Sequence, residues 1–238
     1  PVQSSSYPTV LFNAMVKPWT AFPIKGVIWY QGEANVGRSE QYGDLFPALI
    51  TDWRRQWRSD FPFYFVQLAN FMESKKIQPD SEWAALREAQ TKALKLDQVG
   101  MAVTIDIGLA DDIHPKNKQE VGRRLALVAL AGSYGKNVSS SAPVFQNYII
   151  KGNKMELDFG QKQDGFQIKG TTLKGFTIAG PDRVFYPAEA MVHDGKIILS
   201  STEVPAPLAA RYGWADNPDC NLYGENGLPV APFRTDCW

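Results

Sequence analysis

The sequence has 238 residues, of which 44% are hydrophobic, and its 25 Lys and Arg are balanced by 25 Asp and Glu. This length suits one large domain or two small ones, and the zero net charge argues against nucleic acid or an anionic membrane surface as the main partner. No apolar run is long enough for a membrane span, and the opening residues lack the pattern of a signal peptide. No Cys and His residues have zinc-ligand spacing, so neither a metal nor another cofactor is expected.

Helix and strand patterns alternate over the first 136 residues. Short β-branched and aromatic runs predict buried strands, and apolar residues on one face predict helices. The predicted strands are 24–30, 63–68 and 101–105, and the predicted helices are 8–19, 39–57, 82–96 and 115–134. Helices of this length between strands imply an α/β unit, with a parallel sheet that is covered on both faces.

The pattern changes at residues 133–143, which are rich in Gly, Ser and Asn and suggest a linker. Short strands separated by turns follow, which predicts an all-β, sandwich-like domain over 143–238 with an irregular tail from residue 215. Cys220 and Cys237 lie in this tail, where they either form a disulfide or remain separate thiols. The predicted strands are 147–150, 155–159, 166–169, 176–179, 183–186, 189–193, 196–200 and 209–214.

Polar residues follow each predicted strand of the α/β unit, at 31–35, at Asn70 and at 106–114. Ligands bind beyond the carboxyl ends of parallel strands, so these segments are expected to share one crevice. The third segment contains His114, one of two histidines, with Asp111 and Asp112 just before it. A nearby carboxylate can fix the tautomer of a histidine and leave its other nitrogen free as a general base. His193 lies in a predicted hairpin without such neighbours, so a structural role at the surface is expected for it.

The cluster Gln31-Gly32-Glu33 has two possible roles. The Gln31 amide and the Gly32 backbone N–H can donate hydrogen bonds to a developing oxyanion. Alternatively, the cluster is a polar turn between strand and helix, with Glu33 or Asn35 as a cap.

Long blocks of this sequence carry a family resemblance: IKGVIWYQGEANVGRSEQYGDLFPALITDWRRQW, FPFYFVQLANF, WAALREAQ, GMAVTIDIG and DIHPKNKQEVGRRLA. Together with the tail RYGWADNPDCNLY, they resemble the sialate O-acetylesterases of the SGNH hydrolase superfamily. The resemblance implies a flavodoxin-like α/β domain that carries a serine nucleophile, a histidine base and an oxyanion hole, with an attached β domain. It also implies removal of O-acetyl groups from sialic acids without a metal.

The resemblance assigns roles to particular residues of this sequence. His114 matches the catalytic histidine, and its supporting carboxylate is Asp111 or Asp112, with Asp106 as a third possibility. Gln31, with Gly32, matches the oxyanion hole, and Glu33 and Asn35 would support that loop. Arg87 would either bind a sialate carboxylate as a bidentate partner or be an arginine on a helix surface.

The nucleophile block that the family carries early in its catalytic domain is missing, because no Gly-x-Ser-x-Gly or Gly-Gln-Ser-Asn occurs in the sequence. Ser4, Ser5 and Ser6 precede a predicted helix and Ser39 opens one, so none of them is nominated as the nucleophile. The first strand and helix of the hydrolase fold are missing too. The parallel sheet is therefore expected to be incomplete at its N-terminus, and another segment of the same protein is expected to carry the serine.

The resulting hypothesis is a serine carboxylesterase for O-acetylated sialic acids, in which this chain supplies the histidine base and part of the oxyanion hole and is inactive alone. One alternative is an acetylesterase for a plant polysaccharide such as acetylated xylan. Another is a non-catalytic carbohydrate-binding or assembly module. A role in glycan degradation suggests a periplasmic, secreted or lysosomal location.

Overall fold

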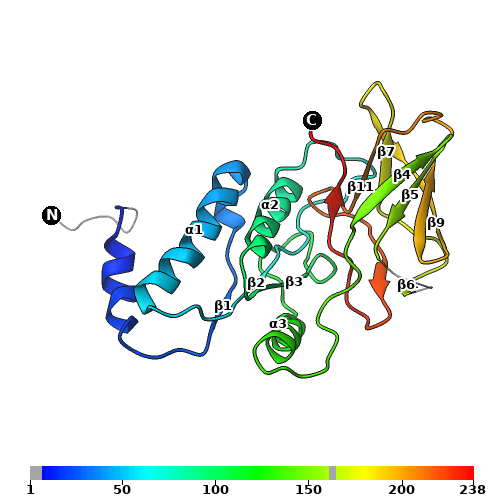
Figure 1. The fold of residues 1–238 in the computed structure, drawn as a ribbon. Coiled ribbons are helices and arrows are strands. Elements are labelled where there is room, and N and C mark those ends of the chain that lie inside the picture. The colour runs from blue at the N-terminus through cyan, green and yellow to red at the C-terminus, as the bar shows by residue number, and fades with distance from the viewer. Residues whose placement is uncertain (1–6, 161–164) are drawn as a thin grey trace.

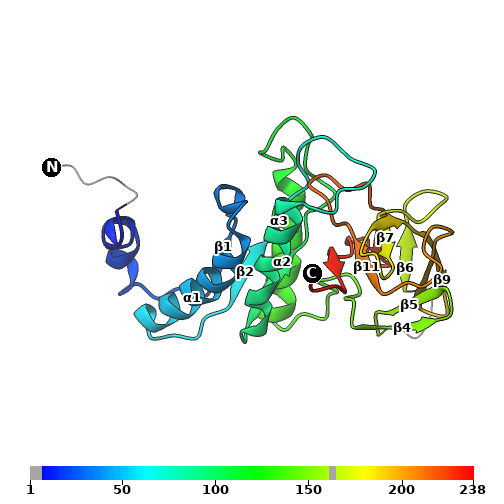
Figure 2. The ribbon, with the colours of Figure 1, turned by 90° about the horizontal axis from the view of Figure 1, so that it is seen from above.

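The structure is a computed structural model that describes residues 7–160 and 165–238. Figure 1 shows helices around a small sheet in the N-terminal half and antiparallel strands in the C-terminal half. We call these halves the α/β unit and the β unit. Seen from above (Figure 2), the N-terminal helical segment, drawn in blue, lies at the opposite end of the molecule from the β unit. Among the described residues, no helix is long and apolar enough to cross a membrane.

The α/β unit has a three-stranded parallel sheet with the order β1-β2-β3. Its central strand is buried on both faces, as the sequence predicts. Successive side chains of a strand point to opposite sides, so they enter two different clusters. Phe63 and Phe65 pack into one cluster with α1 and α2, whereas Tyr64 and Val66 pack into another with α3. The elements are β1 (Val27–Trp29), α1 (Ser39–Trp57), β2 (Phe63–Val66), α2 (Glu82–Thr91), β3 (Val99–Ala102) and α3 (Lys118–Gly132).

Strand β1 lies at an edge of this sheet. The side chain of Ile28, on the face opposite Val27 and Trp29, is 69% exposed. The segment before β1 forms a π-helix (Phe12–Val16) and a 3₁₀ helix (Lys17–Trp19) in place of the single helix predicted over 8–19. Its large apolar side chains are exposed as well: Leu11, Met15, Trp19 and Phe22.

Helix α1 has the predicted bounds, whereas other predicted bounds of the α/β unit are wrong. The predicted helix 82–96 changes at its end into a 3₁₀ turn, Lys92–Lys95. Helix α3 begins at Lys118 and not at residue 115, because the side chain of Asn117 accepts a hydrogen bond of 3.1 Å from the Glu120 N–H and caps the helix there. Pro115 therefore lies in the loop that carries His114, not in a first helical turn.

In its described residues, the β unit has two four-stranded antiparallel sheets and one two-stranded sheet. The four-stranded sheets have the orders β4-β5-β10-β9 and β13-β11-β7-β8, and both contribute side chains to one core, such as Leu157 and Leu199 from the first and Ile178 and Tyr212 from the second. The first sheet contains β4 (Asn147–Lys151), β5 (Lys154–Asp158), β9 (Glu189–His193) and β10 (Lys196–Ser200). The second contains β7 (Phe176–Ala179), β8 (Phe185–Pro187), β11 (Ala209–Tyr212) and β13 (Phe233–Arg234), and the third pairs β6 (Phe166–Ile168) with β12 (Leu222–Gly224).

The prediction of an irregular tail is wrong. Strands β12 and β13 lie within it, and Leu222, Leu228 and Val230 are buried in the core of the β unit. Strand β12 is three residues long and β13 is two, too short to show the alternation that identifies a strand in a sequence. Cys220 and Cys237 are free thiols, so the alternative of separate thiols holds.

Candidate active site

The loops that follow β1 and β2 are held together by Gln90 on α2. Its amide donates 3.3 Å to the carbonyl of Gln31, and its side-chain oxygen accepts 2.9 Å from the N–H of Leu68. The same α2 helix thus fixes the backbone at the carboxyl ends of two neighbouring strands.

The loops that follow β2 and β3 are joined directly. The side-chain oxygen of Asn70 accepts 2.7 Å from the N–H of Gly108, and Phe71 and Leu109 form an isolated parallel bridge. A Cβ at position 108 would collide with the backbone of Asn70, so only glycine allows this approach. Further along the third loop, Ile113 packs against the same buried cluster as Tyr30, the last residue before Gln31. The three loops therefore meet at one edge of the sheet.

His114 lies on this edge with its side chain 83% exposed. Its Nδ1 is 3.4 Å from Oδ1 of Asp112, and its backbone N–H donates 2.9 Å to the same oxygen. Donation from this N–H lowers the pKa of Asp112 below its usual range, and Lys116 and the imidazole add to the effect. Asp112 is therefore a carboxylate at neutral pH, and it lies beside Nδ1 of the imidazole. Asp111 is exposed and makes no contact of this kind with His114.

Gln31 is oriented from two sides. Its amide nitrogen donates 2.7 Å to Oδ1 of Asn35, and the Tyr42 hydroxyl lies 3.3 Å from both its side-chain oxygen and its carbonyl. Gly32 is buried with φ +154°, and a Cβ there would lie 3.2 Å from the Gln90 amide nitrogen. One N–H of the Gln31 side chain remains for a ligand, on a loop whose conformation is fixed.

The alternative in which Glu33 or Asn35 is a helix cap is not what the structure has. The 3₁₀ turn Glu33–Asn35 and helix α1 both begin without a side-chain cap. Asn35 contacts Gln31 instead, which agrees with the expected support of that loop. Glu33 is half-buried and raises the pKa of nearby Tyr30, although burial of the Tyr30 ring is the larger cause and the pKa reaches about 12.

Residues 3–131, more than half of the chain, match the family described as carbohydrate esterase, sialic acid-specific acetylesterase. The chain belongs to this family. It is 32% identical to the sialate O-acetylesterases of Mus musculus and Homo sapiens, over 94% and 98% of this chain and 47% and 50% of theirs. A crystal structure of a carbohydrate acetylesterase from Xanthomonas citri superposes with a TM-score of 0.92 at 46% identity, over 97% of this chain and 55% of that one. The chain thus spans about half the length of these relatives, and the SGNH-type hydrolase fold fits the structure.

Asp106, the third possible partner of His114 in this member of the esterase family, is engaged elsewhere. Its carboxylate binds the guanidinium of Arg124 at 2.6 and 2.9 Å and accepts 3.1 Å from the hydroxyl of Tyr223. Arg124 is nearly buried and also donates 2.7 Å to the carbonyl of Val103. This buried ion pair ties α3 to the loop that carries His114, so Asp106 holds the loop and makes no ion pair with His114.

Arg87 does not have the exposed position that either expectation requires. It is fully buried, and its guanidinium donates to the carbonyls of Leu68 (2.8 Å), Ala69 (2.9 Å), Ala215 (2.7 Å) and Asp216 (2.8 Å). Burial lowers its pKa to about 10, so it stays charged at neutral pH. Both readings of Arg87, as a ligand for a sialate carboxylate and as a surface arginine, conflict with this geometry. It joins the α/β unit to the tail.

Three further residues of the site were missed in the sequence. Tyr42 and Gln90 hold the Gln31 loop, and Tyr30 sits at the end of β1 under Lys118, whose amine is 5.2 Å from the centre of the Tyr30 ring. Each occupies an apolar helix face or a strand end, where the sequence pattern indicates core packing only.

His193 also has a carboxylate neighbour, contrary to expectation. Its Nε2 is 3.4 Å from Oδ2 of Asp194, in the turn between β9 and β10. Ser4, Ser5 and Ser6 lie outside the described residues. Elsewhere in the described part of the chain, no serine is hydrogen-bonded to His114, and no three His, Cys, Asp or Glu side chains are grouped to hold a metal ion.

Proposed function

We propose that this chain is part of a serine carboxylesterase that removes O-acetyl groups from sialic acids. The observation that carries the proposal is the His114–Asp112 pair on the same sheet edge as Gln31 and Gly32, in a chain of the sialic acid-specific acetylesterase family. Glu33 and Asn35 support the Gln31 loop in this proposal. Acetylesterase action on carbohydrates is the coarser class that the named relatives support.

In the proposed reaction, Nε2 of His114 takes the proton of a serine hydroxyl, and the serine oxygen attacks the acetyl carbonyl. Asp112 holds the imidazole through Nδ1 and stabilises the imidazolium. The side-chain amide of Gln31 and the backbone N–H of Gly32 donate to the tetrahedral oxyanion. As the C–O bond of the ester breaks, the His114 imidazolium gives its proton to the departing sugar oxygen, which leaves as a hydroxyl. Water then attacks the acetyl-enzyme, with His114 taking its proton, and releases acetate and the serine.

The serine belongs, in this proposal, to another segment of the same protein. The edge position of β1 and the exposed side chain of Ile28 support the addition of a further strand there, which would extend the parallel sheet. Residues 1–136 would then be the C-terminal part of a flavodoxin-like SGNH domain, and 143–238 an attached sandwich-like domain. The chain without that segment is expected to be inactive.

An experiment with separate segments tests the proposal. This chain is mixed with the upstream segment of its protein, and hydrolysis of 9-O-acetylated N-acetylneuraminic acid is compared with hydrolysis of acetylated xylan. Activity restored by mixing, and higher on the sialic acid, is the expected result. Higher activity on xylan would replace the substrate by a plant polysaccharide. Glycan binding without turnover would instead identify a carbohydrate-binding or assembly module.

The place of action is part of the proposal. An esterase for O-acetylated sialic acids meets its substrate on glycans, which supports a periplasmic, secreted or lysosomal location. Fractionation of the source cells, followed by detection of the protein with an antibody, tests it. Recovery of the protein in the cytosolic fraction alone would contradict it.

A further inference from the structure

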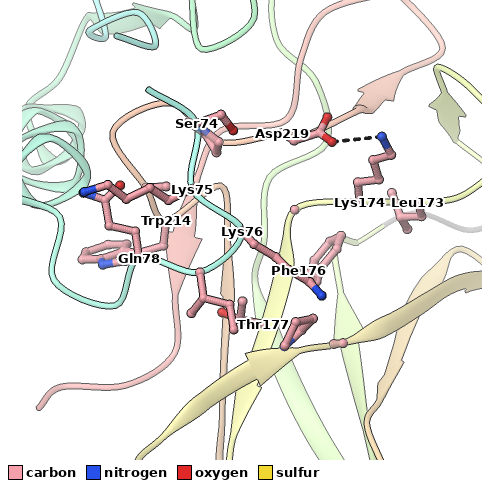
Figure 3. Close-up of a pocket in the computed structure, with 16 residues that line it drawn as sticks. Ser74, Lys75, Lys76, Gln78, Leu173, Lys174, Phe176, Thr177, Trp214 and Asp219 are labelled. Carbon is pink, nitrogen blue, oxygen red and sulfur yellow. Dashed lines mark hydrogen bonds and ion pairs between the residues drawn. The ribbon is translucent and has the colours of Figure 1, made fainter. Parts of the chain in front are cut away.

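A pocket of about 420 Å³ lies between the loop that follows β2 and the β unit. One wall comes from residues 74–78, and the other from residues 173–177 and the start of the tail (Figure 3). Neither His114 nor Gln31 lines it, so it does not overlap the candidate active site. Its volume is in the range of small-molecule sites, about 300–1,000 Å³.

Positive charge is concentrated in this pocket. Lys75, Lys76 and Lys174 line it, and Asp219 is the acidic residue among the lining residues. Asp219 forms a 2.9 Å ion pair with Lys174, whereas Lys75 and Lys76 have no ion pair in the described part of the chain. Figure 3 shows the Lys76 side chain reaching across the pocket toward Phe176. Because Lys75 and Lys76 lack an acidic partner among the described residues, the lining has an excess of positive charge, which favours an anionic ligand.

Both walls of the pocket are fixed before any ligand binds. The N–H of Lys174 donates 2.8 Å to the side-chain oxygen of Asn221, which holds the turn that presents this lysine. On the other wall, the side-chain oxygen of Gln78 accepts 3.1 Å from the N–H of Asp216, and the Gln78 amide donates to the Asp216 carboxylate. The Asp216 carboxylate accepts from these neutral donors and keeps its charge, and it lies outside the lining of the pocket. Such preorganisation lowers the entropic cost of binding.

The rest of the lining combines apolar and hydroxyl groups. Phe176 and Trp214 supply apolar surface, and Ser74 and Thr177 supply hydroxyls. A sugar ring presents both kinds of surface, with hydroxyls at its rim and C–H groups on its faces. No arginine lines this pocket, so it lacks the planar fork that binds phosphate in a bidentate way.

We propose that this pocket binds a carboxylate-bearing pyranose, a uronic or sialic acid unit, with Lys76 at the carboxylate. The proposal concerns binding and does not depend on the esterase reaction. It places an acidic-sugar site at the junction of the two units.

The test measures binding to the intact protein by calorimetry or NMR titration. The probes are methyl β-D-glucuronide and the methyl α-glycoside of N-acetylneuraminic acid, with methyl β-D-glucoside and inorganic phosphate as comparisons. None of the probes carries an O-acetyl ester, so turnover does not interfere. We expect saturable binding of at least one acid, weaker at high salt, and little binding of the neutral glucoside. The acid that binds more tightly identifies the kind of sugar.

Matched variants locate the binding. Lys76→Glu should weaken binding of the acid by about tenfold or more, because it places a like charge opposite the carboxylate. Lys136→Glu makes the same charge change on an exposed residue beyond α3 and should alter binding by less than about twofold. Lys76→Gln should give an intermediate loss without a new charge. The proposal is overturned if the glucoside binds as well as the acids, if only phosphate binds, or if both Lys76 variants bind like the unmodified protein.

Discussion

The two histidines of this chain have nearly the same immediate surroundings. His114 lies 3.4 Å from a carboxylate oxygen of Asp112 with 83% of its side chain exposed, and His193 lies 3.4 Å from one of Asp194 with 67% exposed. A histidine beside a carboxylate is therefore not enough to identify a catalytic base. What separates the two is their place in the fold.

The neighbour of His193 is explained by the turn that joins β9 to β10. His193 pairs with Lys196 across this hairpin, and Asp194 and Gly195 have φ values of 49° and 72°. Turns of this kind favour Asp followed by Gly, so a carboxylate is present for a conformational reason. Asp112 also binds the backbone N–H of His114, on a loop next to the oxyanion candidates. In that position an imidazole–carboxylate pair can act on a ligand.

The largest expected difference is between His114→Ala and His193→Ala in the protein that contains the serine segment. Loss of the base should lower kcat by about 10⁶-fold, as in serine hydrolases that lose their histidine. His193→Ala should leave kcat unchanged, because that hairpin is not part of the site. Release of acetate from an O-acetyl sialic acid measures both. Equal activity of the two variants would remove the functional distinction between the histidines.

A smaller loss of kcat is expected when the carboxylate beside His114 is replaced by an amide. Asp112→Asn should lower kcat by about 10⁴-fold, because an amide no longer fixes the tautomer or stabilises the imidazolium. Asp111→Asn and Asp194→Asn serve as controls and should have little effect. Steady-state kinetics of the three variants on an acetyl ester measures these differences. A large loss for Asp111→Asn with none for Asp112→Asn would assign the supporting role to Asp111.

Removal of the oxyanion donor should cost less again. Gln31→Ala should lower kcat by about 10²–10³-fold with little change in KM, because the donor acts mainly on the charge of the transition state. Gln119→Ala, on the exposed surface of α3, is the matched control. An increase in KM alone would show that Gln31 binds the substrate and not the oxyanion.

The smallest expected effect concerns stability and pH. The pKa of Asp112 is lower in the folded chain than in the unfolded one, mainly through the His114 N–H. Its contribution to stability is therefore present above the unfolded value of about 3.9 and is lost as the pH falls through the folded value. Thermal unfolding between pH 2 and 6 should show a weaker pH dependence for Asp112→Asn than for the unmodified chain. Identical curves would contradict the shift.

The sequence predicted the elements whose pattern is local. Helix α1 has the predicted bounds because its apolar face recurs over five turns, and β2 was recognised from its uninterrupted apolar run. The polar segments after each strand were also expected at one edge, since parallel strands require it. The roles of His114, Asp112 and Gln31 stay predictions until activity is measured.

What the sequence did not predict depends on partners far away in the chain. In the sequence, Arg87 is one polar residue of a predicted helix. Its burial depends on the carbonyls of Ala215 and Asp216, which contact it only after the tail folds back. The short strand β13 is likewise defined by its pairing with β11 and not by its own pattern. The choice between Asp111 and Asp112 depends on loop conformation, which residue spacing leaves open.

Arg87 also affects how the chain unfolds. Its guanidinium donates to two carbonyls just after β2 and to two in the tail. Detachment of the tail would therefore remove two acceptors and leave a buried charge without its hydrogen bonds, which is unfavourable. Arg211 adds a second link, because it binds Asp236 at 2.6 Å and the carbonyl of Pro79 at 2.7 Å. Partial melting of either unit is thereby disfavoured. The two halves should exchange their core amides with solvent as one cooperative unit.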